Sequence, residues 1–300
     1  MDSRTLFLAT RPWSFTMTFS SVTLGTLIAY LAGSFNVGLY MLTLGGMIAF
    51  HAATNLINDF YDVKHGVDKM GAPTTKYRPH PVAAGAESPY TIRAWAAVFY
   101  VLTLLTGVYL SWARNPWVLV LVGVGVAASV LYTADPVVLK AKGMGEVIVF
   151  LMWGPLIPLG SYVVQTGTLS ILPVVVSIPI GLFVALVLLA NNVRDIEYDG
   201  SVETRTVPVM VGRNRGVIIY QSLLLIAYLF VPVFIVAGLL SPWSLLVLLT
   251  SPEALRLWKM FQGQIPDNAD PRTASLAFKY ALAYMASFIL QILIPIHIPL

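Results

Sequence analysis

Long apolar stretches alternate with short polar connections along this chain. Nine of these stretches approach the roughly 20 residues that a helix needs to cross a bilayer. They lie at 14–33, 37–57, 93–113, 116–133, 146–165, 169–191, 216–239, 243–261 and 277–297. The eighth is the weakest, because it contains Glu253, Arg256 and Lys259. The pattern predicts an all-α polytopic membrane protein with nine transmembrane helices, formed by residues 1–300 as a single domain.

The composition agrees with this prediction. Of the 300 residues, 57% are hydrophobic and only 11% are charged, and the mean hydropathy is +0.78. Soluble domains carry about 25% charged residues, so this chain cannot cover a globule with charge. The absence of cysteine excludes disulfides, thiolate chemistry and cysteine-ligated metals. The expected surroundings are a lipid bilayer, and no nucleic-acid partner is expected.

The charged residues are distributed unevenly between the two predicted faces. With nine spans, 17 of the 18 Lys and Arg residues fall on alternate boundaries, and Arg114 is the exception. The positive-inside rule therefore predicts a multi-pass protein of the cell membrane with a cytoplasmic N-terminus and an outer C-terminus. All 14 acidic residues lie at or toward the same cytoplasmic side. Any polar chemistry is expected on that face.

The end of the second predicted span holds an unusual group of amides and carboxylates. In the stretch ATNLINDFYDVKHGVD, residues 53–68, Asn55 and Asp59 are four apart, as are Asn58 and Asp62. Side chains four residues apart share one face of a helix. The same span contains His51, a polar group inside an apolar stretch, for which a hydrogen-bonded role and a catalytic role both stay open.

A second cluster ends the sixth predicted span, in LANNVRDIEYDG at 189–200. Here Asn191, Asp195 and Asp199 follow one another at intervals of four along a single stripe. Because the second and sixth spans run in the same direction, both clusters are expected at the cytoplasmic side. The repetition suggests two related halves whose clusters face each other across a bundle.

Carboxylates at these spacings repel one another unless a cation neutralises them. Mg²⁺ prefers oxygen ligands and is typically bound by a few carboxylates together with substrate phosphates. A single carboxylate at a membrane boundary is usually only solvated, but two matched clusters are harder to explain in this way. The predicted metal ligands are Asn58, Asp62, Asp195 and Asp199. Metal ions held there would neutralise a diphosphate leaving group.

These residues resemble the UbiA superfamily of intramembrane prenyltransferases. The first motif matches as Asn58-Asp59-x-x-Asp62 and the second as Asp195-x-x-x-Asp199. The resemblance implies nine helices around a central cavity, with two Asp-rich motifs at the cytoplasmic side that bind Mg²⁺ and an isoprenyl diphosphate. The form NLINDFYDxxxGxD is similar to the branch of 1,4-dihydroxy-2-naphthoate polyprenyltransferases, which act in menaquinone synthesis.

The resemblance also implies roles for individual residues in the transfer of a polyprenyl group to an aromatic acceptor. The residues expected to be catalytic are Asp62, Asp195, Asp199 and Tyr132, whose ring would shield an allylic cation. The residues expected to bind substrate are Asn55, Asn58, Asp59, Asp68, Lys140, Arg78, Arg205, Asn191 and Asn192. The basic residues among them have a second interpretation, because topology alone explains most Lys and Arg in loops.

Two alternatives stay open at this point. The acceptor could instead be 4-hydroxybenzoate, homogentisate or geranylgeranylglyceryl phosphate, although the spacing of Gly66 and Asp68 favours the naphthoate. The chain could also be a transporter, a class that places ionisable residues near the middle of the bilayer. The gathering of every acidic residue at one face argues against transport.

Overall fold

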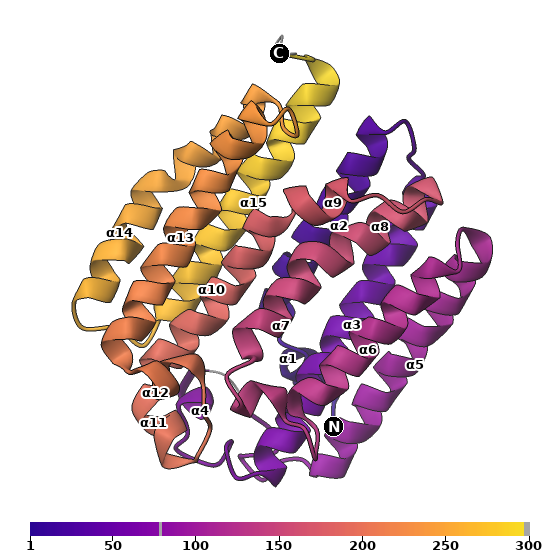
Figure 1. Ribbon diagram of the computed structural model, residues 1–300. Helices are drawn as coiled ribbons and strands as arrows, with labels where there is room; N and C mark the ends of the chain where they lie inside the picture. The colour runs from indigo at the N-terminus through magenta and orange to yellow at the C-terminus, as the bar shows by residue number, and fades with distance from the viewer. Residues whose placement is uncertain (78–79, 297–300) are drawn as a thin grey trace.

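The structure is a computed structural model that describes residues 1–77 and 80–296, and the regular elements in this part of the chain are helices (Figure 1). In chain order they are α1 (Ser3–Ala9), η1 (Pro12–Ser14), α2 (Phe15–Leu31), α3 (Val37–Lys64), α4 (Pro73–Tyr77), α5 (Pro89–Ala113), α6 (Trp117–Thr133), η2 (Leu139–Ala141), α7 (Gly145–Leu151), η3 (Met152–Leu156), α8 (Ile157–Thr166), α9 (Leu172–Val176), α10 (Ile178–Arg194), α11 (Ile196–Ser201), α12 (Val207–Val211), α13 (Arg213–Val236), η4 (Pro242–Thr250), α14 (Ser251–Gln262) and α15 (Ala269–Leu293).

Among the described residues, six helical segments are long and apolar enough to cross a bilayer. They are Pro12–Leu31, Val37–Lys64, Pro89–Ala113, Gly145–Thr166, Arg213–Val236 and Ala269–Leu293. Two shorter apolar helices, α6 and α10, lie where the fourth and sixth spans are predicted. The chain is thus a multi-pass membrane protein, and the count of nine spans stays a prediction.

The predicted span at 243–261 is divided in the structure. Its first part is the 3₁₀ helix η4, and its second part is α14, which begins at Ser251 with Pro252 in its first turn. Proline lacks a backbone N–H, so it is tolerated in the first turn of a helix but interrupts a helix that would run through it. The break therefore falls where the sequence places Pro252.

The helices that carry polar residues extend beyond their apolar parts. Helix α3 continues past the predicted end at 57 to Lys64, and α15 begins at Ala269 rather than at 277. A hydropathy pattern reports only the part of a helix that lipid surrounds, whereas the hydrogen-bonded helix continues into water. As a result, Asn58 and Asp62 lie on the last turns of α3.

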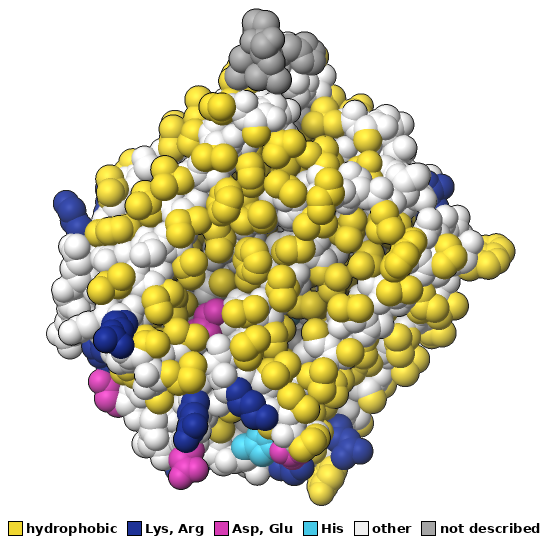
Figure 2. All heavy atoms as spheres, viewed as in Figure 1, with side chains coloured by type: hydrophobic (Ala, Val, Ile, Leu, Met, Phe, Trp, Pro, Cys, Tyr) yellow, Lys and Arg dark blue, Asp and Glu magenta, His cyan; other side chains and the backbone are white. Residues whose placement is uncertain are grey.

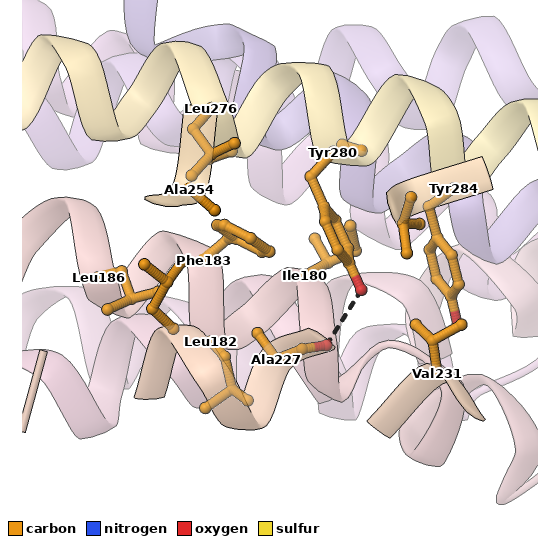
Figure 3. Packing of buried hydrophobic residues seen from close by; sticks show 14 of the residues in the cluster. Ile180, Leu182, Phe183, Leu186, Ala227, Val231, Ala254, Leu276, Tyr280 and Tyr284 are labelled. Atoms are coloured by element: carbon orange, nitrogen blue, oxygen red, sulfur yellow. Dashed lines mark hydrogen bonds between the residues drawn. The ribbon is translucent and has the colours of Figure 1, made fainter. Parts of the chain in front are cut away.

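A core of buried aromatic side chains joins α10, α13 and α15 (Figure 3). Phe183 packs on Tyr280 with ring centroids 4.3 Å apart. The Tyr280 hydroxyl donates a hydrogen bond to the Ala227 carbonyl at 3.1 Å, and the Tyr284 hydroxyl donates to the Val176 carbonyl at 2.8 Å. Both buried hydroxyls are therefore satisfied. This packing fixes α10, whose last turn begins the second polar cluster, against α13 and α15.

Two glycines bring the middle of the chain against α10. Helix η3 is a π-helical turn that contains Gly154 and Pro155. Gly154 faces Gly181 of α10. A Cβ atom on Gly181 would lie only 2.7 Å from the Gly154 Cα atom, so the backbones touch there. Small residues allow such close approach between helices in a membrane. The contact anchors α10 to the segment α7–η3–α8.

Charge is concentrated at one end of the molecule. Figure 2 shows an apolar surface over most of this face, with the visible acidic side chains in its lower half. The charged end carries the N-terminus and α4, α11 and α12, while α15 ends at the opposite end (Figure 1).

Arg114 is the basic residue that departs from the predicted charge distribution, and it caps α8. Its Nε atom donates to the Val164 carbonyl at 2.8 Å, and its guanidinium donates to the Gln165 carbonyl at 2.6 Å. Its position therefore has a structural reason. The orientation of the chain across the membrane stays a prediction.

Candidate active site

A cavity of about 1050 Å³ opens at the charged end of the bundle. Asn58 and Asp62 line it from α3, and Asn191 lines it from α10. Asp195, which follows the last residue of α10, and Asp199 of α11 also line it. The two polar clusters, far apart in sequence, therefore border one space.

A lysine bridges the side chains of the first cluster. The Lys140 ammonium, from η2, donates to the Asn58 side-chain oxygen at 2.6 Å and forms an ion pair with Asp62. The Asn58 amide also donates to Asp62, at 2.7 Å. The same ammonium lies 5.9 Å from the centre of the Tyr132 ring. Four residues predicted from the sequence are thus brought together, with a cation between the oxygen atoms.

An arginine organises the second cluster. Arg194 donates to both carboxylate oxygens of Asp195, at 2.6 and 2.7 Å, and to the Asn191 side-chain oxygen at 2.7 Å. Its guanidinium also forms an ion pair with Asp270, at the start of α15. The Arg194 side chain is only 6% exposed, so these are buried, charge-assisted hydrogen bonds. Sequence reasoning missed Arg194, although its place between Asn191 and Asp195 in NNVRD was a usable signal.

Asp199 has a higher pKa than a solvated carboxylate. Burial, together with the negative charge of Asp195, raises the pKa of Asp199 to about 7, although a hydrogen bond from Thr206 opposes the shift. The Thr206 hydroxyl lies 3.3 Å from the carboxylate. A raised pKa of this kind means that the buried carboxylate lacks a sufficient positive partner among its neighbours. A cation bound beside Asp199 would supply that partner.

A hydrogen bond ties the segments of the two clusters together. The Tyr198 hydroxyl, from α11, donates to the Val67 carbonyl at 2.6 Å. Val67 follows the end of α3 and borders the cavity, as does Tyr198. The two sides of the polar opening are therefore linked directly.

Asp59 lies behind the first cluster rather than at the cavity wall. Its carboxylate forms an ion pair with Arg11, and it lies 3.9 Å from His80 Nε2. The Ala83 N–H donates to His80 Nδ1 at 3.2 Å, so Nε2 carries the ring proton and donates to Asp68 at 3.0 Å. Asp68 lines the cavity, so this buried group positions a predicted residue from behind. Arg11 and His80 were not predicted.

The remaining predicted residues are placed as follows. Asn55 donates to the Thr10 carbonyl at 2.8 Å, and Asn192 donates to Glu146 at 2.8 Å; both line the cavity. Arg205 is exposed and does not line the cavity, and its backbone N–H donates to the Ala141 carbonyl at 3.2 Å. Arg78 lies outside the described residues.

His51 lines the cavity deeper in the bundle. Its Nδ1 atom lies 2.8 Å from the Thr18 hydroxyl, and its Nε2 atom lies 3.2 Å from the Ser14 hydroxyl. The rings of Phe15 and Trp153 pack edge-on against the imidazole. Both ring nitrogens are thus within hydrogen-bond distance of a hydroxyl, and this arrangement agrees with a role in holding α2 against α3.

The donor atoms around the cavity suit a hard divalent cation. Asn58, Asp62, Asp195 and Asp199 line one space and offer it amide and carboxylate oxygens. Oxygen ligands select Mg²⁺, Ca²⁺ or Mn²⁺ over softer metals. The raised pKa of Asp199 is a second sign that this wall accommodates positive charge. The residues therefore fit a magnesium site.

Comparison with known proteins identifies the family of the chain. The model of the UbiA prenyltransferase family matches residues 18–286. The chain is 32% identical to the 1,4-dihydroxy-2-naphthoate octaprenyltransferase of Bacillus subtilis over 265 residues, which cover 88% of this chain and 84% of that protein.

Solved structures agree on the fold. A UbiA homolog from Aeropyrum pernix K1 matches with a TM-score of 0.72 and 17% identity, over 92% of this chain and 98% of that one. A UbiA homolog from Archaeoglobus fulgidus bound to GPP and Mg²⁺ matches with a TM-score of 0.61 and 15% identity, over 94% of this chain and 99% of that one. The two polar clusters around one cavity and these similarities lead to one conclusion: the chain belongs to the UbiA prenyltransferase family.

Proposed function

We propose that this protein transfers a polyprenyl group from an isoprenyl diphosphate to 1,4-dihydroxy-2-naphthoate, with loss of the carboxylate as CO₂. The observation that carries the proposal is the pair of Asn- and Asp-bearing clusters, from different helices, that line one cavity. The choice of acceptor is supported by the similarity to the Bacillus subtilis octaprenyltransferase and by the GxD spacing at Gly66 and Asp68.

Mg²⁺ is the proposed cofactor, and Asn58, Asp62, Asp195 and Asp199 would hold it. When bound, it neutralises the diphosphate as the leaving group. The Archaeoglobus fulgidus homolog bound to GPP and Mg²⁺ supports this assignment. Lys140 adds a positive charge on the same wall, where it already contacts Asn58 and Asp62 and would meet the phosphate oxygens.

The proposed reaction has two steps, cleavage of the prenyl donor and attack by the acceptor ring. The carbon–oxygen bond of the prenyl donor breaks at the charged end, and its electron pair leaves with the diphosphate. The allylic cation that remains needs neighbours that stabilise charge without attacking it, and the ring of Tyr132 meets this requirement. The acceptor ring then forms a carbon–carbon bond with the allylic carbon and loses its carboxylate as CO₂.

The acceptor is tested with purified protein in detergent, Mg²⁺ and geranylgeranyl diphosphate. Parallel reactions contain 1,4-dihydroxy-2-naphthoate, 4-hydroxybenzoate or geranylgeranylglyceryl phosphate, and mass spectrometry identifies the products. We expect a prenylated naphthoquinol that has lost the carboxylate mass, and no product from the other two acceptors. Product from another acceptor alone would keep the family and the site but overturn the naphthoate assignment.

The requirement for Mg²⁺ is expected to depend on pH. The pKa of Asp199 is raised to about 7, so its carboxylate is largely protonated below that pH and ionised above it. A metal ligand must be deprotonated, so protons compete with the metal. We expect the Mg²⁺ concentration for half-maximal activity to rise about fivefold from pH 7 to pH 6, and less than about twofold from pH 8 to pH 7. Activity measured across Mg²⁺ titrations at pH 6, 7 and 8 tests this, and identical titration midpoints would contradict it.

A further inference from the structure

An apolar pocket lies between α3, α5, α6 and α8, next to the cavity of the candidate site. Its volume is about 70 Å³, far smaller than the cavity. Phe50 and Met152 line both spaces, and both are buried, so these two side chains form the partition between pocket and cavity. The proposed reaction does not otherwise use this pocket.

The pocket is a slot that runs along the helices. On each of the four helices its lining residues extend over two turns, about 10 Å of helix axis. These stretches are Thr43–Phe50, Thr103–Leu110, Val118–Gly125 and Ile157–Val164. Phe50 is the end of the α3 stretch that lies nearer Asn58, so the slot leads away from the polar clusters.

The walls offer no hydroxyl hydrogen to a ligand. The Thr43, Thr103 and Ser161 hydroxyls donate to the carbonyls of Leu39, Phe99 and Ile157, one turn earlier on their own helices, at 2.7, 2.9 and 2.9 Å. The Thr106 hydroxyl donates in the same way to Leu102, at 2.9 Å. Aliphatic side chains and glycines make up most of the remaining lining. A hydrocarbon is the ligand that such a surface accommodates.

We infer that the slot receives the far end of the isoprenyl tail of the prenyl donor. The inference rests on the proposed function, which places the diphosphate beside Asn58 and Asp62. Phe50 lies on the same helix, about 12 Å of helix axis from Asn58. A tail that begins at the clusters and follows α3 therefore reaches the partition, and a longer tail passes it. The slot then distinguishes prenyl donors by length.

Gly125 lies beside the partition formed by Phe50 and Met152, and its lack of a side chain leaves room for a prenyl tail to pass. A Cβ atom at Gly125 would lie 3.3 Å from the Met152 methyl carbon and 3.6 Å from the Phe50 ring. Any larger side chain on this residue would project between Phe50 and Met152. Gly125→Leu is therefore expected to close the slot while leaving the cavity and its polar clusters in place.

The test compares geranyl, farnesyl and geranylgeranyl diphosphates as prenyl donors for the unmodified protein and for Gly125→Leu. We expect kcat/KM of Gly125→Leu to fall at least about tenfold for the longest donor and to stay within about twofold for geranyl diphosphate. Val124→Leu is the matched control, because Val124 neighbours Gly125 but is 51% exposed. Its values are expected to follow those of the unmodified protein. An equal loss for all three donors would overturn the inference.

A second measurement needs no substitution. A farnesyl diphosphate with a photoreactive diazirine at its far end is bound to the unmodified protein, irradiated, and located by peptide mass spectrometry. Labels on the slot stretches of α3, α5, α6 or α8 are expected. Labels on the apolar recess between α2, α10 and α15, which Met17, Phe183 and Phe278 line, would overturn the inference.

The two proposals fail in different ways. If the unmodified protein consumes no diphosphate with any acceptor, the proposed function is wrong and the inference falls with it. If the unmodified protein is active but Gly125→Leu keeps its preference among the three donors, the inference alone is wrong.

Discussion

Replacing Asp62 by Asn is expected to lower the turnover of prenyl transfer by at least about 100-fold, more than the loss of an outer-shell partner causes. The substitution keeps the shape of the side chain but removes the negative charge that pairs with Lys140 and would hold Mg²⁺. Turnover at saturating prenyl donor and acceptor, measured over a range of Mg²⁺ concentrations, is the relevant quantity. Asp199→Asn is expected to behave in the same way, because Asp199 lines the same cavity.

Glu197→Gln provides the matched control. Glu197 lies in α11 between Asp195 and Asp199, but its side chain is 76% exposed and pairs with Arg213 away from the cavity lining. Loss of such a surface pair costs little, so turnover is expected to stay within about twofold of the unmodified protein. Normal turnover in Asp62→Asn would show that the first cluster does not hold the metal.

Arg194→Met is expected to lower the free energy of unfolding by about 3 kcal/mol, because it leaves buried carboxylates without their cation. Arg194 is 6% exposed, and its partners Asp195 and Asp270 are 10% and 20% exposed, so water can replace little of the lost interaction. The substitution also frees the start of α15 from the end of α10. Unfolding in detergent micelles, followed by tryptophan fluorescence, measures the change.

Arg213→Met is the comparison for this prediction. Arg213 also pairs with a carboxylate, but it is 39% exposed and its partner Glu197 is 76% exposed. The expected loss is under about 1 kcal/mol, as for other surface ion pairs. Equal losses in the two variants would mean that the Arg194 group is solvated and does not stabilise the junction of α10 and α15.

The helical class and the approximate positions of the spans were predictable because lipid imposes long apolar runs on a chain. The end of α3 and the start of α15 were not predictable from hydropathy, because the polar residues Asn58, Asp62 and Asp270 belong to helices that continue beyond their apolar parts. The break before α14 had a visible signal in Pro252. The close contact of Gly154 with Gly181 had no signal in the sequence, because it depends on which helices cross in the fold.

The same contrast holds for the site. The placement of Asn58 and Asp62 was predictable because helical spacing puts them on one face of α3. The single stripe predicted for Asn191, Asp195 and Asp199 is divided in the structure, because α10 ends before Asp195 and a new helix, α11, follows, but all three residues line the same cavity. Their partners were not predictable. Arg11 and His80 reach Asp59 from other segments, and only the tertiary fold brings these segments together. For Arg78 and Arg205, the sequence could not separate substrate contact from topology.

The one-sided distribution of charge has a consequence for how the reaction runs to completion. The substrate enters as an amphiphile, with a charged head that matches the polar end of the bundle and a hydrocarbon tail that matches its apolar surface (Figure 2). Prenyl transfer divides it into diphosphate, which dissolves in water, and a prenyl group joined to the acceptor, which dissolves in lipid. The two products therefore depart into different phases, and this partition opposes their recombination at the site.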